Sequence, residues 1–399
     1  MKKIILTVFL FCLLQLSVFA KTGISFIYIN GSNNNDLKMK NWYEKGVRKF
    51  HPNMKKAFYE NCLAQKYFLK NGKYFIQENP IIFFWGDRSH KEITFVDEDL
   101  KISKGFSPWF AFFVRKTIAH YLHDAIWIQK YHNMEPVLQD LNESVKKEAQ
   151  KGNKVVLFGY SAGSFVTYEY LLTRTPYINV KEFFEKVGTS KNQMNFIKKH
   201  PVKNTCMVAL GKELAVFSAT GHVIPNDSNN EIFKKDYMNL NNLTDTYCTP
   251  NQAVKGIVNF ATPLVLFYSD LSDPNFQITY YNRLLFEYII EKDMFWLTVN
   301  YREDPLGFPC GRNLTIEEIE DIANLDIEPH AGFVYDQSNT RGGRMVFVAH
   351  TSYWPTSKRF SKAVAKAYVN GYLHQYGDTV PCKNNRRKKF IKIKKDTTP

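Results

Sequence analysis

Ser161 stands at the centre of a five-residue segment, Gly159–Gly163, with a glycine two residues away on either side. The apolar run Val155–Phe158 comes before this segment, and a helix-forming run, Ser164–Leu172, follows it. This order predicts a sharp strand-to-helix turn, in which glycines avoid the collisions that Cβ atoms would cause. Such a turn holds the serine hydroxyl away from the sheet, beside the N–H groups that begin the helix. The segment therefore predicts a nucleophilic serine.

The segment resembles the nucleophile elbow of the α/β-hydrolase superfamily, since its GxSxG pattern lies between a strand and a helix. A serine hydroxyl is a poor nucleophile at neutral pH and needs a base that is itself oriented by an acid. In this superfamily the acid and then the histidine follow the serine along the chain. The resemblance implies Ser161 as the nucleophile, Asp304 as the acid and His350 as the base.

The acid is expected just beyond the end of a strand. Asp304 follows the strand-like run Phe295–Asn300 and lies in a turn that contains proline and glycine, which would hold its side chain rigidly. Asp270 and Asp273 also follow a strand-like run, and Glu303 adjoins Asp304, so these three residues remain alternatives.

The base is expected after the last strand. His350 directly follows the apolar run Met345–Ala349, which we interpret as that strand. His330 and His374 also lie beyond Asp304 in the chain. His330 precedes the expected strand and His374 lies in the expected closing helix, so both fit the position less well.

The oxyanion of an acyl-transfer reaction needs two preorganised hydrogen-bond donors. The resemblance implies that one is the backbone N–H of Ala162, directly after the nucleophile, and that the other follows an early strand. Asn30-Gly31-Ser32 is the best match, with asparagine where related lipases and esterases often have histidine. The second donor stays open between Gly31 and Ser32, and an ordinary Asn-Gly turn remains the alternative.

The elements that would position these residues alternate between apolar runs and helical patterns. The runs do not alternate apolar with polar residues, which indicates an α/β fold whose mostly parallel sheet is covered by helices on both faces. The expected strands are Gly23–Ile29, Pro80–Trp85, Val155–Phe158, Gly256–Ala261, Leu264–Phe267, Phe295–Asn300 and Met345–Ala349, and the expected later helices are 106–131, 135–151 and 361–375. Parallel sheets carry their chemistry beyond the carboxyl ends of the strands. The segment of about 175–255 breaks the alternation and is expected to be a cap or lid insertion above the sheet.

The amino terminus predicts export. Lys2 and Lys3 precede the apolar run Ile4–Leu16, and the small residue Ala20 offers a cleavage site, so residues 1–20 read as a signal peptide. An uncleaved anchor is the alternative. The predicted organisation is this signal, a hydrolase domain over 21–382 and a basic tail over 383–399, in a protein that is secreted or held in the periplasm or cell envelope.

The formal net charge is +15, and removal of Lys2 and Lys3 leaves +13. Seven cations lie between positions 386 and 395 with no acidic residue among them. This tail could bind an anionic membrane surface, although a solvated, disordered terminus explains it as well. A nucleic-acid partner is not expected, because no binding motif accompanies the charge.

Five cysteines remain after residue 20, an odd number, so at least one cannot pair within the chain. They are Cys62, Cys206, Cys248, Cys310 and Cys382. We expect a Cys206–Cys248 disulfide, since these two bracket one polar stretch. No cysteine or histidine pair has zinc-ligand spacing.

Taken together, these features predict an exported serine hydrolase, similar to lipases and esterases, that cleaves small-molecule or lipid carboxylic esters through an acyl-enzyme without a cofactor. An acyltransferase or peptidase could use the same three residues, and a non-catalytic envelope-binding protein is the alternative outside enzymes.

A group of aromatic residues could line an acyl pocket or belong to the core: Phe106, Trp109, Phe110, Phe112 and Phe113.

Overall fold

The structure is a computed structural model that describes residues 22–32, 37–89, 94, 98, 123–219, 230–250, 252–264, 280–309, 332–342 and 346–376. The expected signal peptide, the aromatic group around Trp109 and the basic tail lie outside these residues. Residues 265–267 of the expected strand Leu264–Phe267 also lie outside the described residues, and so do residues 106–122 of the expected helix 106–131.

A seven-stranded parallel sheet forms the centre of the molecule, in the order β2-β1-β4-β7-β8-β9, with β3 beside the second half of β1. Its strands are β1 (Thr22–Ile29), β2 (Tyr74–Ile76), β3 (Ile81–Phe83), β4 (Lys154–Tyr160), β7 (Val254–Phe260), β8 (Phe295–Thr298) and β9 (Phe333–Asp336). This architecture confirms the expected α/β class with a mostly parallel sheet.

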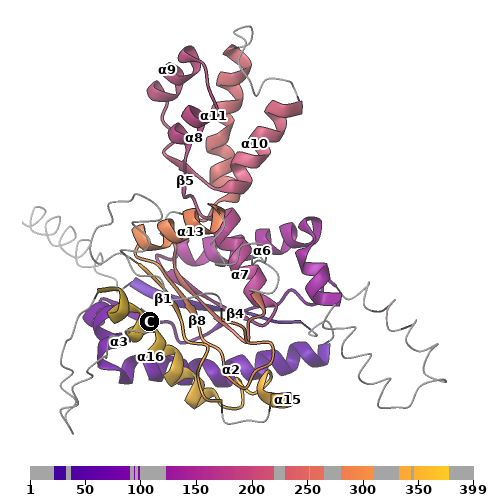
Figure 1. Cartoon of the computed structure of the whole chain (residues 1–399), viewed down its shortest axis with the longest axis vertical. Helices are drawn as coiled ribbons and strands as arrows, with labels where there is room; N and C mark the ends of the chain where they lie inside the picture. Colours follow the sequence, from indigo (N-terminus) through magenta and orange to yellow (C-terminus); the bar gives the residue numbers. More distant parts are fainter. Residues whose placement is uncertain are drawn as a thin grey trace, which may run out of the picture.

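Helices cover both faces of the sheet (Figure 1). One face carries α2 (Leu37–Glu60), α3 (Cys62–Tyr67), η1 (Lys70–Gly72) and α16 (Ser357–Tyr376); the other carries α6 (Tyr131–Gln150), α7 (Gly163–Arg174) and α13 (Tyr280–Glu291). Successive strand residues point to opposite faces, so Phe26 joins the first core and Ile27 the second. Burial on both sides explains why the strands read as continuous apolar runs.

The expected last strand is wrong. Val346–Ala349 forms the short helix α15, and the strand next to β8 is β9, Phe333–Asp336. Val346 and Val348 are half exposed, at 50% and 49%. Phe333 packs on α16 and takes the sheet position that the run of valines was expected to fill. His350 therefore follows a helix rather than a strand.

The segment between α7 and β7 forms a separate helical body with its own apolar core. It contains β5 (Ile178–Asn179), α8 (Val180–Lys186), α9 (Lys191–Lys199), β6 (Asn204–Thr205), α10 (Met207–Ala219) and α11 (Asn230–Tyr247). The expected disulfide is confirmed: Cys206 and Cys248 are bonded, with 5.6 Å between their Cα atoms. Cys62 is disulfide-bonded as well.

This helical body does not lie where a lid over Ser161 would lie. Its two ends meet where Thr249 N donates to Arg174 O at 2.7 Å, and Ala253 O then accepts from Val155 N at the amino end of β4. Val155 is separated from Ser161 by the length of the strand, about 20 Å at 3.3 Å per residue. Figure 1 shows α8–α11 and α15 at opposite ends of the molecule. The insertion was expected, but its position as a cap is corrected, because it leaves the sheet at the amino edge.

Candidate active site

The turn between β4 and α7 has the sharp geometry that the sequence predicts. Ser161 has a φ of +52°, in the left-handed region that costs strain for a residue with a side chain. A Cβ atom on Gly159 would lie 2.6 Å from Asn259 Oδ1, and one on Gly163 would lie 2.6 Å from Ile29 O. Only glycine fits at these two positions, so the flanking glycines are what allow the turn.

Ser161, His350 and Asp304 form one continuous chain of hydrogen bonds. His350 Nε2 lies 3.0 Å from Ser161 Oγ, and His350 Nδ1 lies 3.0 and 3.2 Å from the two carboxylate oxygens of Asp304. Ser161 follows β4 and Asp304 follows β8, two strands away in the sheet, which is about 10 Å at 4.8 Å per strand. The imidazole between them spans that gap. All three residues are mostly buried, with 3–7% of their surface exposed.

The carboxylate of Asp304 is held by more than the histidine. Its Oδ1 accepts a hydrogen bond from Leu306 N at 2.9 Å, within the turn that the sequence predicts. Its Oδ2 accepts a hydrogen bond from the hydroxyl of Tyr353 at 2.9 Å. Burial, and secondly the charge of Asp304, raise the pKa of Tyr353 well above its ordinary value, so this phenol remains a donor. Sequence reasoning did not find Tyr353.

Tyr160 fixes the segment that carries the histidine. Its hydroxyl donates to His350 O at 2.9 Å, and its ring packs on the imidazole with 5.6 Å between centroids. Because Tyr160 directly precedes Ser161, Ser161 and His350 are linked through the backbone as well as through their side chains. The position of Tyr160 beside the serine was the one signal in the sequence that could have indicated this role.

A network of buried polar side chains stabilises the turn at Ser161. Ser164 Oγ donates to Ser161 O at 2.6 Å, and Thr262 Oγ1 donates to Ser164 Oγ at 2.7 Å. Thr262 N in turn donates to Asn300 Oδ1 at 3.2 Å, which links the turn to the end of β8, two strands away. Satisfied buried networks of this kind hold their members in one arrangement.

The residues that were alternatives for the acid and the base do not join this chain of hydrogen bonds where the structure describes them. Glu303 accepts from Gly342 N and pairs with Arg302, so its carboxylate is committed elsewhere. His374 lies in α16 with its ring against Tyr335. The remaining alternatives, Asp270, Asp273 and His330, lie outside the described residues.

The loop after β1 lies directly against Ser161. A Cβ atom on Gly31 would lie 2.7 Å from Ser161 Cβ and 2.9 Å from Tyr160 O, so the two backbones touch there. Asn30 anchors this loop, because its Oδ1 and its backbone carbonyl accept from the backbone N–H and the indole N–H of Trp85, each at 2.8 Å.

Ala162 is the first residue of the turn into α7, where backbone N–H groups point out of the helix end. Ala162 and Gly31 thus flank Ser161, and Ser32 is half-buried at the next position. Their roles as oxyanion donors stay predictions.

Within the described residues, no group of three or more histidine, cysteine, aspartate or glutamate side chains could hold a metal ion. Likewise, none of the helices in the described ranges is both long and apolar enough to cross a membrane.

Comparison of the chain with protein-family models, with curated proteins and with solved structures found no match.

Proposed function

We propose that this chain is a serine hydrolase that cleaves carboxylic esters, with Ser161 as the nucleophile, His350 as the base and Asp304 as the acid. The observation that carries the proposal is the unbroken hydrogen-bond chain from Ser161 Oγ through the imidazole to the Asp304 carboxylate. Serine, histidine and carboxylate in this arrangement are recognised by geometry and role rather than by fold. Membership of the α/β-hydrolase superfamily is part of the proposal, supported by the parallel sheet, the strand-turn-helix around Ser161 and the order of the three residues.

The distances suit each step of acyl transfer. His350 Nε2 takes the Ser161 proton as the serine oxygen attacks the ester carbonyl carbon, and donors at Ala162 and Gly31 or Ser32 stabilise the oxyanion. Collapse of the tetrahedral intermediate breaks the bond to the alcohol, which leaves with the proton from His350. Water then gives a proton to His350 as its oxygen attacks the acyl-enzyme carbonyl carbon. When this second intermediate collapses, the bond between the acyl carbon and Ser161 Oγ breaks, His350 returns the proton to Ser161 Oγ, and the acid leaves. Asp304 keeps Nδ1–H directed toward itself, so Nε2 faces the serine throughout.

We also propose that the protein is exported to an oxidising compartment. The basic and apolar first twenty residues support export, and the Cys206–Cys248 disulfide supports an environment in which thiols oxidise.

A fluorophosphonate probe tests the nucleophile directly. We expect covalent labelling of the wild type and none of Ser161→Ala, because only an activated serine attacks the probe. Ser144→Ala is the control, since this hydroxyl bonds only the backbone of its own helix, at Asp140 O, and its loss should leave labelling unchanged. Peptide mapping that places the label elsewhere would remove the basis of the proposal.

Ester turnover tests the base. His350→Ala should reduce turnover of a nitrophenyl ester at least a thousandfold while the circular-dichroism spectrum remains that of the folded protein. Retained turnover in a folded variant would mean that another residue acts as the base.

A further inference from the structure

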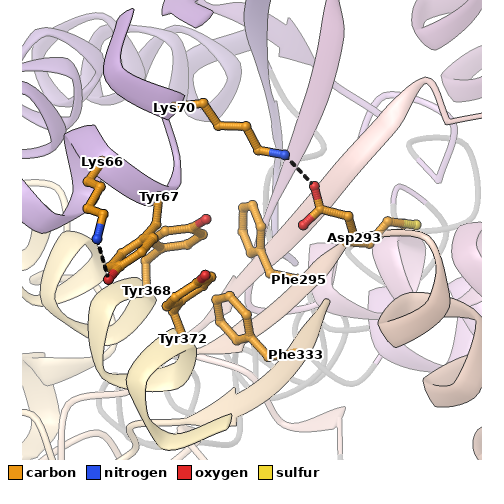
Figure 2. Close-up of a pocket in the computed structure, with 9 residues that line it drawn as sticks. Lys66, Tyr67, Lys70, Asp293, Phe295, Phe333, Tyr368 and Tyr372 are labelled. Atoms are coloured by element: carbon orange, nitrogen blue, oxygen red, sulfur yellow. Dashed lines mark hydrogen bonds and ion pairs between the residues drawn. The ribbon is translucent and has the colours of Figure 1, made fainter. Parts of the chain in front are cut away.

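A pocket of about 200 Å³ lies at the opposite edge of the sheet from Ser161. Phe295 and Phe333, the first residues of β8 and β9, form its floor, and α3, η1 and α16 surround it (Figure 2). Ser161 follows the carboxyl end of β4, whereas these two residues stand at amino ends. The pocket is therefore separate from the proposed active site, and what it binds is a separate question.

Aromatic rings line one side of the pocket. Tyr67 and Tyr372 are stacked with 3.9 Å between centroids, and Phe295 and Phe333 are stacked at 6.0 Å. Tyr368 meets both phenylalanines edge to face, at 5.1 and 5.3 Å. Flat aromatic and apolar molecules gain contact area against such a wall without polar groups being buried unpaired.

One polar group on this wall lacks a partner. Tyr368 is only 4% exposed, and its hydroxyl has no hydrogen-bond partner among the described residues. Burial, and secondly the charge of Asp293, raise its pKa well above the ordinary value, so the hydroxyl keeps its proton and can donate. In Figure 2 this hydroxyl points toward the side of the pocket on which Lys70 and Asp293 lie. The hydroxyl is not among the buried unpaired atoms of the described residues, so it is accessible from the pocket and can donate to a ligand's acceptor.

The charge around the pocket is unbalanced. Lys70 Nζ lies 2.8 Å from Asp293 Oδ2, and Lys255 Nζ lies 3.8 Å from the same oxygen, so two ammonium groups share one carboxylate. Lys66 borders the other side, where it donates to Tyr67 OH at 3.2 Å. Three cations against one anion give a positive local potential, which favours an anionic ligand.

We propose that this pocket binds a small aromatic carboxylate, with its ring against the tyrosines and phenylalanines and its carboxylate accepting from Tyr368 OH and Lys70 Nζ. The volume lies below the roughly 300–1,000 Å³ of sites for drug-sized ligands, so a molecule with a single ring fits. The proposal does not depend on the esterase activity.

Calorimetry with three probes of equal size and different charge tests the pocket: benzoate, benzyl alcohol and benzylamine. We expect benzoate to bind one-to-one and with the highest affinity, and benzylamine to show no saturable binding. Tyr368→Phe keeps the ring contacts and removes the donor, so it should weaken benzoate binding about tenfold, the usual scale for a hydrogen bond to a charged group. Tyr131→Phe, on a tyrosine that is 65% exposed on α6, is the matched control and should bind as the wild type does.

Lys70→Met is the second variant, on a side chain that is 41% exposed and therefore tolerant of change, and it should also weaken benzoate binding. Benzoate affinity that is unchanged in both variants would place its binding elsewhere and overturn the proposal. Tighter binding of benzylamine than of benzoate, or no binding of any of the three probes, would overturn it too.

Discussion

Tyr353→Phe is the sharpest test of how the proposed acid is held. The Tyr353 hydroxyl donates to Asp304 Oδ2 at 2.9 Å and accepts from Tyr301 N at 2.9 Å, and its ring stacks on that of Tyr301 with 4.2 Å between centroids. Phenylalanine keeps the stack and loses both hydrogen bonds. Tyr353 is fully buried, so it acts on the reaction only through Asp304.

The expected losses follow from these two bonds. A hydrogen bond to a charged group contributes about 1.5–3 kcal/mol, and the N–H of Tyr301 is left buried without an acceptor, so we expect the free energy of unfolding to fall by about 3 kcal/mol. Asp304 still accepts from Leu306 N and from His350, so its orientation is loosened rather than lost. We expect kcat to fall about tenfold, which is about 1.4 kcal/mol of barrier, with KM unchanged.

Ester turnover, with urea unfolding on the same samples, measures both effects. Tyr301→Phe is the matched control: it loses a buried hydroxyl that bonds Thr356 Oγ1 at 2.6 Å in the same stack, and it keeps the backbone bond that Tyr301 O accepts from Asp304 N. A lower kcat in both variants, or an unchanged kcat in Tyr353→Phe, would refute a positioning role for Tyr353.

Three further perturbations follow from the contacts. Gly31→Ala places a Cβ atom 2.7 Å from Ser161 Cβ, so the turn must shift, and fluorophosphonate labelling should slow at least tenfold; labelling at the wild-type rate would contradict this close approach. Burial lowers the pKa of Lys255 to about 8 from 10.5, so between these pH values Lys255 binds more protons in the unfolded chain, and its own contribution to the free energy of unfolding rises with pH by up to about 3 kcal/mol. Buried tyrosines with raised pKa values lower the free energy of unfolding over the same range in both proteins, so the test is the difference between the wild type and Lys255→Met, measured by urea unfolding at pH 7.5 and 10.5. This difference should move in favour of the wild type as pH rises, and an unchanged difference would argue against a lowered pKa. Replacing Cys206 and Cys248 with alanine opens a bridge between residues separated by 42 positions, which should destabilise the helical body by about 4 kcal/mol while ester turnover at 25 °C persists; lost turnover would couple that body to the site.

The predictions that the structure confirms depend on short stretches of sequence. The turn at Ser161 depends on the sterics of five consecutive residues, with glycines where Cβ atoms would collide, and such constraints are visible without the fold. The Cys206–Cys248 pair was inferred from the stretch that it brackets and is present. The parallel sheet could be inferred because strands that bury both faces leave a continuous apolar run.

The last strand was misassigned because local preference and packing disagree there. Val346–Ala349 has the β-branched composition of a strand, but β9 pairs with β8 and fills that edge, so the valines remain in a short, half-exposed helix. The insertion was misplaced for a related reason. Its composition shows only that it leaves the alternating pattern, whereas the direction of α7 decides at which edge of the sheet it begins.

From residue order alone, the chain determines a serine on a strained turn, an acid and a histidine farther along, and a sheet covered on both faces, because these depend on local sterics and burial. Tertiary structure decided that the His350 imidazole lies between Ser161 and Asp304, that Tyr353 holds the carboxylate, and that aromatic rings and lysines meet at the far edge of the sheet. The three contacts around His350 and Asp304 join residues that are 46, 49 and 189 positions apart. Such pairs are chosen by the packing of whole elements, which no short stretch of sequence encodes.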